Sequence, residues 1–585
     1  MNGTCMAVSP LQTLITLVTS LINTQTPEDL NSPLQLLNGA TFDFIIVGGG
    51  SAGCVLANRL SEIQNWSILL LEAGGEEPFE ADVPGFLGYS YDTRMNWQFE
   101  TVPEEIICGG KSCPVVRGKG LGGSSDINAM LYVRGNKLDY DNWAHLGNTG
   151  WDFKNVLPYF KKSENNLDPD ISKDTKYHST GGYLSVGRFP YQDTAVQNLS
   201  AAFNEIGFKY VDFNAEKQTG IMISQVTQEN GERFSSNRAF LKPIRKRQNI
   251  KVVTNIRITK ILIEPKTKTA YGIEYVGEKN QKIHNKVYAS KEVILSSGAV
   301  GSPVLLMRSG IGPKDVLDVL GIKAIKYLDV GRNLQDHATV PGSYYMIRKY
   351  EDTQVTNLLM NSILYSRPKR QGPWSATGTT QVVAFAKTKY ASQNIDYPDI
   401  GIYFLIDAAS KENELNKLNF IPTVLRPKSR GKITINSTDP FSPPLIYPNY
   451  FSHPYDIKVH LESYKIAEEL ANTTSFKLAN YKLNVSALPT EEYFKTGNNS
   501  EWRDLANFRL FSIFHLSGTC KMGPSNDTSA VVDPTLKVHG VKQLRVIDAS
   551  IMPHLVSGNI NAPTMMIAEK GADMIKKFWI KTFKK

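Results

Sequence analysis

The chain has 585 residues, of which 41% are hydrophobic and 21% are charged, and its formal net charge is +9. This length exceeds what one hydrophobic core usually serves, so we expect two domains or one elaborated domain. The composition is ordinary for a soluble globular protein, and so modest a charge over this length favours a mixed solvated surface over a nucleic-acid-binding face.

The N-terminal segment is apolar but short. Residues 11–22 read LQTLITLVTSLI, which is too short to span a bilayer as a helix and suits the apolar region of a secretory signal. Residues 1–10 contain no Lys or Arg, which argues against such a signal. We nevertheless predict a signal peptide over residues 1–22, a linker over residues 23–40, and a secreted protein with no stable membrane span.

Residues 42–72 have the pattern of a βαβ unit. An apolar run stops at Gly48, and Gly50 and Gly53 complete a G-x-G-x-x-G turn before a helical pattern and a second apolar run that ends in Glu72. The first glycine of such a turn allows a tight bend, the second lets the backbone approach a pyrophosphate, and the third lets helix and strand pack closely. The phosphates sit at the helix N-terminus, and the acidic residue can accept hydrogen bonds from an adenosine ribose. The turn alone predicts a dinucleotide without distinguishing FAD from NAD.

Cysteines and glycosylation sequons bear on the compartment. Cys54 lies on the predicted helix as a small core residue. Cys108 and Cys113 flank a four-residue loop, which permits a disulfide hairpin in an oxidising compartment, with two unpaired thiols as the alternative. Nothing nearby supplies further Cys or His at zinc spacing, so we expect no metal. The N-x-S/T sequons are individually weak and together favour secretion and glycosylation. They lie at Asn2, Asn65, Asn198, Asn436, Asn472, Asn484, Asn498 and Asn526.

The rest of the chain alternates between loop, strand and helix patterns. Residues 76–116 hold few periodic runs and indicate an extended loop, whereas short alternating segments from about 340 to 500 indicate an antiparallel sheet, with a helical stretch at 455–471. A buried strand at 544–548 and a long helix from near Thr564 follow, which indicates that one domain is assembled from distant parts of the chain. Individual strands are predicted at residues 250–253, 259–263, 272–275, 292–296, 381–386, 400–405 and 432–435.

Two segments are suited to a close approach to a cofactor. Within residues 118–141, the Gly-Gly pair at 122–123 makes a loop that can lie against a flat ring, and Asn128 offers both a donor and an acceptor. Within residues 298–312, the Ser-Pro pair at 302–303 is expected to start a helix. The alternative for each segment is an ordinary turn that enters a helix.

Two C-terminal segments carry candidate catalytic side chains. His515 follows an apolar stretch and precedes a glycine turn, so its ring could face a cavity, although a single His is more often structural. Asn559 and Asn561 precede a helix that starts near Pro563, whose N-terminal dipole could stabilise an anion. The alternative is that the two asparagines merely cap this helix.

Taken together, these segments resemble the glucose–methanol–choline (GMC) family of FAD-dependent oxidoreductases. The resemblance covers residues 43–575 and includes both family signatures, at 118–141 and 298–312. The chain is similar in particular to the insect glucose-dehydrogenase-like branch, whose secreted members carry a cysteine pair placed like Cys108 and Cys113. Smaller matches lie at residues 231–243, 330–337 and 546–553.

The resemblance implies an α/β FAD-binding domain, Rossmann-like and of GMC type, plus an α+β substrate domain with an antiparallel sheet. Residues 41–340 would form the N-terminal part of the FAD-binding domain, with substrate-domain insertions, and 341–500 mainly the substrate-binding domain. Residues 501–585 would complete the FAD domain and the active site. The residues expected to bind FAD are Gly48, Gly50, Ser51, Ala52, Gly53, Glu72, Ala73, Arg117, Gly122, Gly123, Asn128, Ala129, Asp548, Asn561, Ala562, Pro563 and Thr564.

The resemblance also implies that His515 and Asn559 are the catalytic pair. An alcohol releases hydride only as its hydroxyl proton is lost, because the carbonyl forms as negative charge builds on oxygen. His515 would accept that proton, since imidazole has a pKa near neutrality, and Asn559 would hydrogen-bond the developing alkoxide. The hydride would pass to flavin N5, and the helix dipole after Pro563 would stabilise the reduced anionic flavin.

Several positions depart from the family pattern. Some relatives tether the flavin through a His at the position of Ile127, so we predict non-covalent FAD. Asp126 stands where relatives often have an apolar residue, and its charge would need a partner. The usual Pro-Val after the catalytic His is replaced at residues 516–517 by Leu-Ser, and Ile560 stands where Thr is frequent. These changes put glucose itself in doubt and favour a more apolar alcohol.

The predicted function is FAD-dependent oxidation of the CH–OH group of a sugar, aromatic or terpenoid primary alcohol to the carbonyl. The electron acceptor is expected to be O2 or a quinone, and the protein a monomer or homodimer that binds no nucleic acid. Two alternatives stay open. One is a hydroxynitrile lyase-type FAD protein on the same fold, and the other is a secreted flavoprotein without activity, against which the presence of His515 and Asn559 argues.

Overall fold

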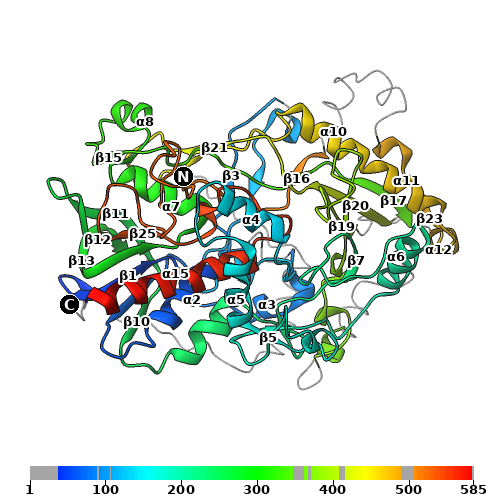
Figure 1. Ribbon diagram of the computed structural model, residues 1–585, viewed down its shortest axis with the longest axis horizontal. Coiled ribbons are helices and arrows are strands. Elements are labelled where there is room, and N and C mark those ends of the chain that lie inside the picture. Colours follow the sequence, from blue (N-terminus) through cyan, green and yellow to red (C-terminus); the bar gives the residue numbers. More distant parts are fainter. Residues whose placement is uncertain are drawn as a thin grey trace, which may run out of the picture.

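The computed structural model of the chain contains two large β-sheets, which lie toward opposite ends of the molecule (Figure 1). The predicted signal peptide at 1–22, and the predicted linker as far as residue 36, lie outside the residues that the structure describes. The described residues are 37–88, 91, 93–105, 107–277, 280–346, 361–365, 370–407, 416–488, 506 and 509–582.

The first sheet is mixed, in the order β10-β2-β1-β13-β12-β11, and β25 also pairs with β13. Strands β10, β2, β1, β13 and β25 run parallel to one another, whereas β12 pairs antiparallel with both β13 and β11. All four residues of β2 and the last four of β1 are buried, as expected for parallel strands covered on both faces. The strands are β1 (Thr41–Val47), β2 (Ile68–Leu71), β10 (Ile250–Val253), β11 (Ile256–Glu264), β12 (Thr269–Gly277), β13 (Asn280–Leu295) and β25 (Leu544–Val546).

The second sheet is antiparallel throughout, in the order β23-β17-β20-β19-β18-β7. Helices α6, α10, α11 and α12 lie at this end of the molecule (Figure 1). The helical stretch expected at 455–471 is two helices that meet at Ser463. The elements are β7 (Gly220–Ile223), β17 (Gly342–Met346), β18 (Val382–Ala386), β19 (Ile400–Asp407), β20 (Asn416–Val424), β23 (Tyr481–Leu483), α6 (Thr194–Glu205), α10 (Pro454–Glu462), α11 (Tyr464–Asn472) and α12 (Thr474–Leu478).

One predicted strand of the antiparallel region does not join the second sheet. It forms β21 (Lys432–Thr434), which pairs with β22 (Leu445–Tyr447) in a separate two-stranded sheet. The backbone N–H of Ile433 donates to the carbonyl of Gly331 at 2.7 Å, so this segment is tied to the loop after the first sheet instead. Its alternating pattern predicted a strand correctly but not the partner of that strand.

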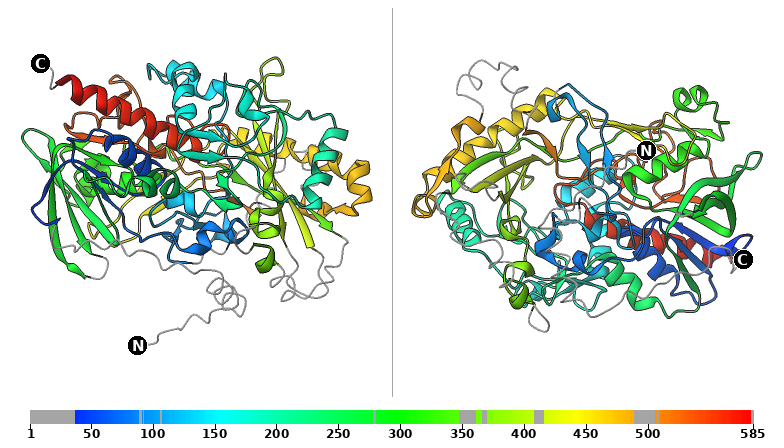
Figure 2. Two further views of the ribbon diagram at one scale, coloured as in Figure 1. Left: turned by 90° about the horizontal axis from the view of Figure 1, so that it is seen from below. Right: turned by 180° about the vertical axis from the view of Figure 1, so that it is seen from behind.

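Two helices from the ends of the described chain pack side by side on the first sheet, as the views of Figures 1 and 2 agree. They are α2 (Ser51–Leu60) and α15 (Asn561–Thr582). The buried guanidinium of Arg59 forms an ion pair with Glu569 at 2.8 Å, and Ser51 Oγ donates to Asn561 Oδ1 at 2.8 Å. The first helix of the dinucleotide turn is therefore completed by residues about 510 positions later in the chain.

Helix α7 (Gly298–Arg308) begins four residues earlier than the Ser-Pro pair predicted. Pro303 lies inside it, where the missing N–H leaves the carbonyl of Ala299 without its helical partner. The hydroxyl of Thr519 donates to that carbonyl at 2.7 Å and replaces the lost hydrogen bond. A contact from distant chain therefore makes a proline tolerable within the helix, and the local sequence could not reveal it.

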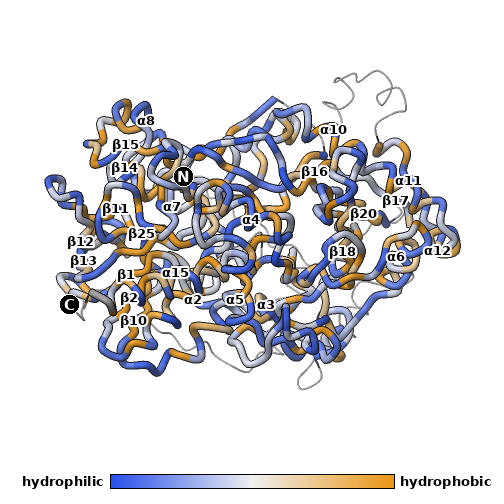
Figure 3. The backbone as a smooth tube through the Cα atoms, viewed as in Figure 1, coloured by the Kyte–Doolittle hydropathy of each residue, from blue (hydrophilic) through white to orange (hydrophobic). Residues whose placement is uncertain are grey.

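Hydrophobic segments gather along β1, β2 and β10 at one end of the molecule and along β18 and β20 at the other (Figure 3). Each large sheet accordingly has its own buried apolar cluster. Between residues 76 and 116, where a loop was expected, the chain has only short elements. The remaining helices and strands are α3 (Phe79–Asp82), α4 (Lys137–His145), α5 (Phe153–Ser163), α8 (Lys314–Val319), β3 (Phe99–Glu100), β4 (Pro114–Val115), β5 (Glu164–Asn166), β6 (Leu184–Val186), β8 (Gln228–Glu229), β9 (Glu232–Arg233), β14 (Ile311–Gly312), β15 (Lys326–Tyr327), β16 (Ala338–Thr339) and β24 (Phe511–Ser512).

Candidate active site

A cavity of about 750 Å³ lies where the ends of β1, β2 and β13 meet residues of β19 and β20. Most of the residues predicted to form the site line it. Gly53, Gly122, Ala562 and Pro563 do not. The predicted residues in the lining are Gly48, Gly50, Ser51, Ala52, Glu72, Ala73, Arg117, Gly123, Asn128, Ala129, His515, Asp548, Asn559, Asn561 and Thr564.

The three glycines of the turn after β1 differ in what a side chain at each position would contact. Gly48 has a φ of +103°, and a Cβ there would lie 2.5 Å from the carbonyl oxygen of Ser296. A Cβ on Gly53 would lie 1.8 Å from the carbonyl oxygen of Gly48. Gly50 has a φ of −81°, lines the cavity, and would bring a Cβ no closer than 3.7 Å to any protein atom. The protein itself does not require a glycine at 50, so this position fits a pyrophosphate that approaches the backbone.

Three helix N-termini open into the same cavity. Ser51 of α2, Gly298 of α7 and Asn561 of α15 all line it. Neither α2 nor α7 has a capping side chain at its N-cap residue. Asp548 takes the N–H of Gly298, the first residue of α7, and the remaining N–H groups of the two first turns are available to a ligand. Each N-terminus carries partial positive charge, and together they suit a ligand with two phosphates. The residues present thus fit a dinucleotide.

Glu72 ties the end of β2 to two glycine loops. Its Oε1 accepts the N–H groups of Gly74 (3.0 Å) and Gly120 (3.2 Å), and its Oε2 accepts that of Gly49 (2.7 Å). Burial raises the pKa of this carboxyl, although the backbone N–H groups act in the opposite direction. Two oxygens offer about four acceptor positions, so one remains on Oε2 for a ribose hydroxyl.

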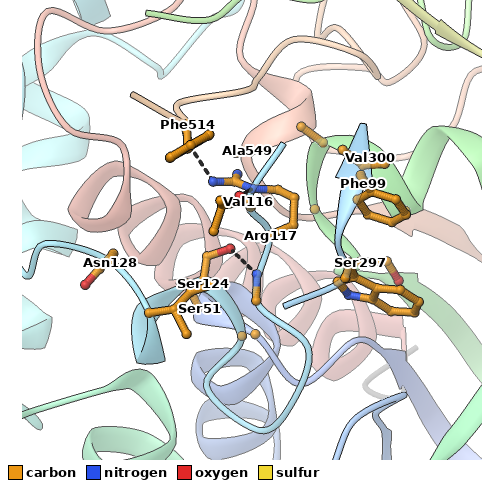
Figure 4. Close-up of a pocket in the computed structure, with 18 of the residues that line it drawn as sticks. Ser51, Phe99, Val116, Arg117, Ser124, Asn128, Ser297, Val300, Phe514 and Ala549 are labelled. Carbon is orange, nitrogen blue, oxygen red and sulfur yellow. Dashed lines mark hydrogen bonds between the residues drawn. The ribbon is translucent and has the colours of Figure 1, made fainter. Parts of the chain in front are cut away.

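Asp548 and Arg117 fix two further walls of the cavity. Asp548 Oδ2 accepts the N–H of Gly298 (2.9 Å) and the hydroxyl of Ser302 (2.6 Å), which holds the N-terminus of α7 against the end of β25. Arg117 donates from Nη2 to the carbonyl of Phe514, next to His515 in the chain (Figure 4). Burial lowers the pKa of the Arg117 guanidinium.

The loop after Arg117 is braced from behind by a buried arginine. Arg233 donates from Nη1 to the carbonyls of Ser125 (3.1 Å) and Asn128 (2.7 Å) and to Asn128 Oδ1 (2.8 Å). Asn128 Oδ1 also accepts the N–H of Met130. The amide oxygen of Asn128 is therefore used by the protein, and its amide nitrogen is the group left to face a ligand in the cavity.

Asp126 does not carry the charge that its sequence position suggested. It is buried beside the carboxyl of Glu77, and burial followed by that neighbouring carboxylate raises its pKa well above the ordinary value. Glu77 accepts from the hydroxyl of Ser235 and pairs with Lys242, so Glu77 is the ionised member. Asp126 is thus driven toward its neutral form, and the positive charge of Arg233 acts in the opposite direction.

The cavity brings the predicted catalytic pair together. Asn559 Nδ2 lies 3.1 Å from His515 Nε2, and the hydroxyl of Tyr403 lies 3.4 Å from Asn559 Oδ1. His515 follows β24, and Asn559 stands two residues before α15. The His515 side chain is buried, which lowers its pKa well below 6.5, and the neighbouring His337 and Arg117 act in the same direction. A neutral imidazole therefore faces the cavity.

Three residues next to this pair were not singled out from the sequence. They are Asp336 and His337, within the matched stretch 330–337, and Tyr403 on β19. His337 Nδ1 lies 2.9 Å from His515 Nδ1. The motif at 330–337 could have indicated Asp336 and His337, because it places an aspartate directly before a histidine. No role for either side chain followed from the sequence alone.

An aromatic pair lines another part of the cavity. The rings of Trp97 and Phe99 are stacked, with centroids 5.5 Å apart and planes within 5°, and the guanidinium of Arg257 lies 5.0 Å from the Trp97 ring. In the view of Figure 4, Phe99 and Ser297 are on one side of the cavity and Asn128 is on the other. A flat aromatic surface with a cation beside it suits stacking on a base such as adenine.

The structure has a disulfide between Cys108 and Cys113, with Cα atoms 5.7 Å apart. Cys54 and Cys520 are free and buried. Burial raises the pKa of both thiols, which makes them unreactive core residues. In the part of the chain that the structure describes, no helix combines the length and apolar character needed to cross a membrane.

Sequence comparisons identify relatives over most of the chain. It matches the N-terminal model of the GMC oxidoreductase family over residues 42–339 and the C-terminal model over residues 427–568. It is 41% identical over 552 residues to a glucose dehydrogenase (FAD, quinone) of Drosophila melanogaster, covering 92% of this chain and 87% of the relative. It is 35% identical over 578 residues to an ecdysone oxidase of Bombyx mori, covering 93% and 83%.

Solved structures agree with these matches. A pyridoxine 4-oxidase from Mesorbium loti superposes with a TM-score of 0.77 at 26% identity, covering 91% of this chain and 98% of the other. A formate oxidase superposes with a TM-score of 0.81 at 26% identity, covering 93% and 99%. The predicted fold class and the predicted family are confirmed, and this chain belongs to the GMC oxidoreductase family.

Proposed function

We propose that this protein is an FAD-dependent enzyme that oxidises the CH–OH group of an alcohol to a carbonyl, with His515 as the proton acceptor. The observation that carries the proposal is the position of the His515–Asn559 pair. Its two facing nitrogens are 3.1 Å apart in the same cavity as the glycine turn and the three helix N-termini. The proposed base and the residues that fit a dinucleotide therefore line one cavity.

The side chains have distinct tasks in this reaction. A neutral His515 accepts the hydroxyl proton of the alcohol at Nε2, and the amide of Asn559 donates to the alkoxide oxygen as charge builds there. When bound, FAD supplies the hydride acceptor for the carbinol hydrogen. Burial of His515 keeps its ring neutral before the alcohol binds, so the base is ready at neutral pH.

We propose that FAD is held without a covalent bond. Ile127 lines the cavity at the position where some relatives have a tethering histidine, and its side chain offers no atom that could bond to a flavin. Acid precipitation of the holoenzyme should leave all the flavin in the supernatant. Flavin that stays with the precipitated chain would contradict this assignment.

We further propose that the substrate is an apolar or aromatic primary alcohol rather than a sugar. The charged side chains that line the described part of the cavity, His515 aside, already bond to backbone groups. A sugar would bury several hydroxyls here, and each one left unpaired costs about 1–3 kcal/mol. The apolar lining from the second sheet and nearby loops comprises Met130, Leu131, Phe404, Leu405, Ile421, Phe511, Ile513 and Phe514.

Anaerobic mixing of the holoenzyme with benzyl alcohol, a terpenoid primary alcohol and glucose tests both proposals. We expect the absorption band of the oxidised flavin to bleach with the first two alcohols, and more slowly or not at all with glucose. Bleaching by none of a wider alcohol panel would contradict the oxidoreductase proposal, and fastest bleaching by glucose would contradict the substrate class alone. Reoxidation with O2 and with a quinone dye then identifies the acceptor. The matched control is His515→Ala with equal FAD content, which should lose bleaching.

The protein is also proposed to be secreted. Residues 11–22, the sequons and the Cys108–Cys113 disulfide support this together. Expression of the full chain in insect cells should release it to the medium, with an N-terminus beginning near residue 23. Retention of the full-length chain inside the cells would contradict the proposal.

A further inference from the structure

We propose that His337 is a positioning residue that holds the proton of His515 on Nδ1, so that Nε2 of His515 is left free to act as the base. This inference rests on the proposed function, because it presumes that His515 is the proton acceptor. The two rings meet through their Nδ1 atoms at 2.9 Å, with centroids 5.1 Å apart. Two Nδ1 atoms at this distance share one hydrogen, and the surroundings decide which ring owns it.

The contact at Nε2 of His337 decides which of the two rings donates the hydrogen between them. His337 Nε2 lies 2.9 Å from the backbone carbonyl of Leu425, and a carbonyl can only accept. Burial lowers the pKa of His337 to about 4, so the ring is neutral and has a single N–H. That N–H is on Nε2, which makes Nδ1 of His337 an acceptor. The hydrogen between the two rings therefore belongs to His515 Nδ1.

The near side of His515 requires the same tautomer. Asn559 Nδ2 is a donor and lies 3.1 Å from His515 Nε2, so Nε2 must present a lone pair. The hydroxyl of Tyr403 lies next to Asn559 Oδ1, which is consistent with this orientation of the amide. The acceptor-only carbonyl of Leu425 therefore prescribes an unprotonated Nε2 on His515 through His337, and the donors from Tyr403 to Asn559 and from Asn559 to His515 run in the matching direction.

One carboxylate holds the two histidines at this separation. Asp336 Oδ1 accepts the backbone N–H of His337 (2.9 Å) and that of His515 (2.6 Å), although these residues are 178 positions apart. Its Oδ2 accepts the hydroxyls of Tyr450 and Ser512. Asp336 is buried, and burial raises its pKa to about 6. The backbones of His337 and His515 are thus both fixed to the Asp336 carboxylate, which keeps the Nδ1 atoms of the two rings facing each other.

The tautomer has a direct consequence for catalysis. If the hydrogen of His515 were on Nε2, an N–H would face the hydroxyl of the alcohol, and the ring could not take the proton. In an otherwise unconstrained imidazole both tautomers are available. His337 removes this choice before the alcohol arrives, and it does so without touching substrate or cofactor.

A pair of substitutions at one position separates the two nitrogens of His337. His337→Asn can place an amide oxygen near the position of Nδ1 and so keep an acceptor for His515. His337→Gln can place an amide nitrogen near the position of Nε2, which keeps the donor to Leu425 but removes the acceptor. At saturating alcohol we expect the rate of anaerobic flavin reduction to fall about 10- to 100-fold in the Gln variant, at or below the lower end of the roughly 10²- to 10⁴-fold that a general base contributes, because the base itself is still present. The Asn variant should recover most of the rate, and KM should change little in either.

A second buried histidine serves as control for packing. His460 bonds through Nε2 to the carbonyl of Val340 and does not line the cavity. His460→Gln should leave the reduction rate unchanged at equal FAD content, even if it lowers the thermal midpoint. Equal rates in the Asn and Gln variants of His337 would overturn the inference, because a merely structural role does not distinguish them in this way.

The tautomer of His515 can also be measured directly, without an activity assay. In ¹⁵N solid-state NMR spectra of histidine-labelled protein, with His515→Ala and His337→Gln used for assignment, Nδ1 of His515 should be protonated and Nε2 should not. A protonated Nε2 overturns the inference and leaves the proposed function to its own test. Conversely, if His515→Ala still reduces its flavin at the parent rate, the proposed function fails whatever the tautomer is.

Discussion

The glycine turn after β1 allows a substitution that separates cofactor binding from folding. Gly50→Ala adds one methyl group that faces the cavity, whereas Gly53→Ala adds the same group between α2 and the preceding turn. We expect the first variant to fold and bind FAD weakly, and the second to lose stability. The two sites are three residues apart in one motif, so each variant is a control for the other.

The distances give the magnitudes. A Cβ at residue 50 makes only an ordinary contact, 3.7 Å from Gly123 Cα, and the φ of −81° is open to alanine, so the free energy of unfolding should change by less than about 1 kcal/mol. A Cβ at residue 53 would lie 1.8 Å from the carbonyl oxygen of Gly48. The helix would have to move, at a cost of about 3 kcal/mol or more.

Gly50→Ala, the variant that is expected to keep its stability, should lose affinity for FAD. The methyl group of Gly50→Ala lies where phosphate oxygens approach the N-terminus of α2, and the loss of one charge-assisted hydrogen bond costs about 1.5–3 kcal/mol. The Kd for FAD should therefore rise about 10- to 100-fold, as measured by quenching of flavin fluorescence in titrations of the apoprotein. Urea unfolding of the apoprotein gives the stability. Parent-like affinity in Gly50→Ala would refute the view that residue 50 is where the backbone approaches the pyrophosphate.

Three other predictions concern pH and the disulfide. The pKa of His515 is well below 6.5, so kcat/KM for the alcohol should stay level as pH falls through 6.5, and a decline centred at or above 6.5 would contradict the burial argument. Burial alone would lower the pKa of His178, but hydrogen bonds to two carboxylates raise it above 6.5. Its contribution to stability is complete below pH 6.5 and is lost as pH rises through the raised pKa. His178→Gln should lower the urea midpoint below pH 6.5 and make the midpoint less dependent on pH above it, whereas an unchanged pH dependence would count against the charged imidazole. The disulfide closes a loop of six residues, so Cys108→Ser with Cys113→Ser should lower the unfolding free energy by at most about 2 kcal/mol, and a reductant should affect the parent but not the variant.

The parts of this fold that the sequence predicted are those with a local periodic signal. The continuous apolar runs of β1 and β2 indicate strands covered on both faces, and the strand at 250–253 coincides with β10. The glycine turn was predictable because it needs particular residues at particular spacings. Motif spacing likewise identified residues that line the cavity, including Asn559 and His515, although most of the lining lies outside the predicted set.

Features that depend on distant partners were not predictable in the same way. Nothing near His337 in the chain indicates that its ring meets His515, because the two residues are 178 positions apart and Asp336 joins them through the backbone. The early start of α7 depends on a hydroxyl from Thr519. The neutral state of Asp126 likewise depends on Glu77, whose carboxylate only the folded chain brings close.

The hydrogen bond from Ser51 to Asn561 joins residues that are synthesised at very different times, because they are 510 positions apart in the chain. Chains are made at about 5–20 residues per second, so ~25–100 s pass between the synthesis of the first partner and the second. During that interval α2 has no α15 to cover it, and the apolar strands beside it are exposed to aggregation. FAD cannot find all three helix N-termini until α15 has emerged. Cofactor loading should therefore follow translation, and chaperones that shield the N-terminal strands should raise the yield of holoenzyme.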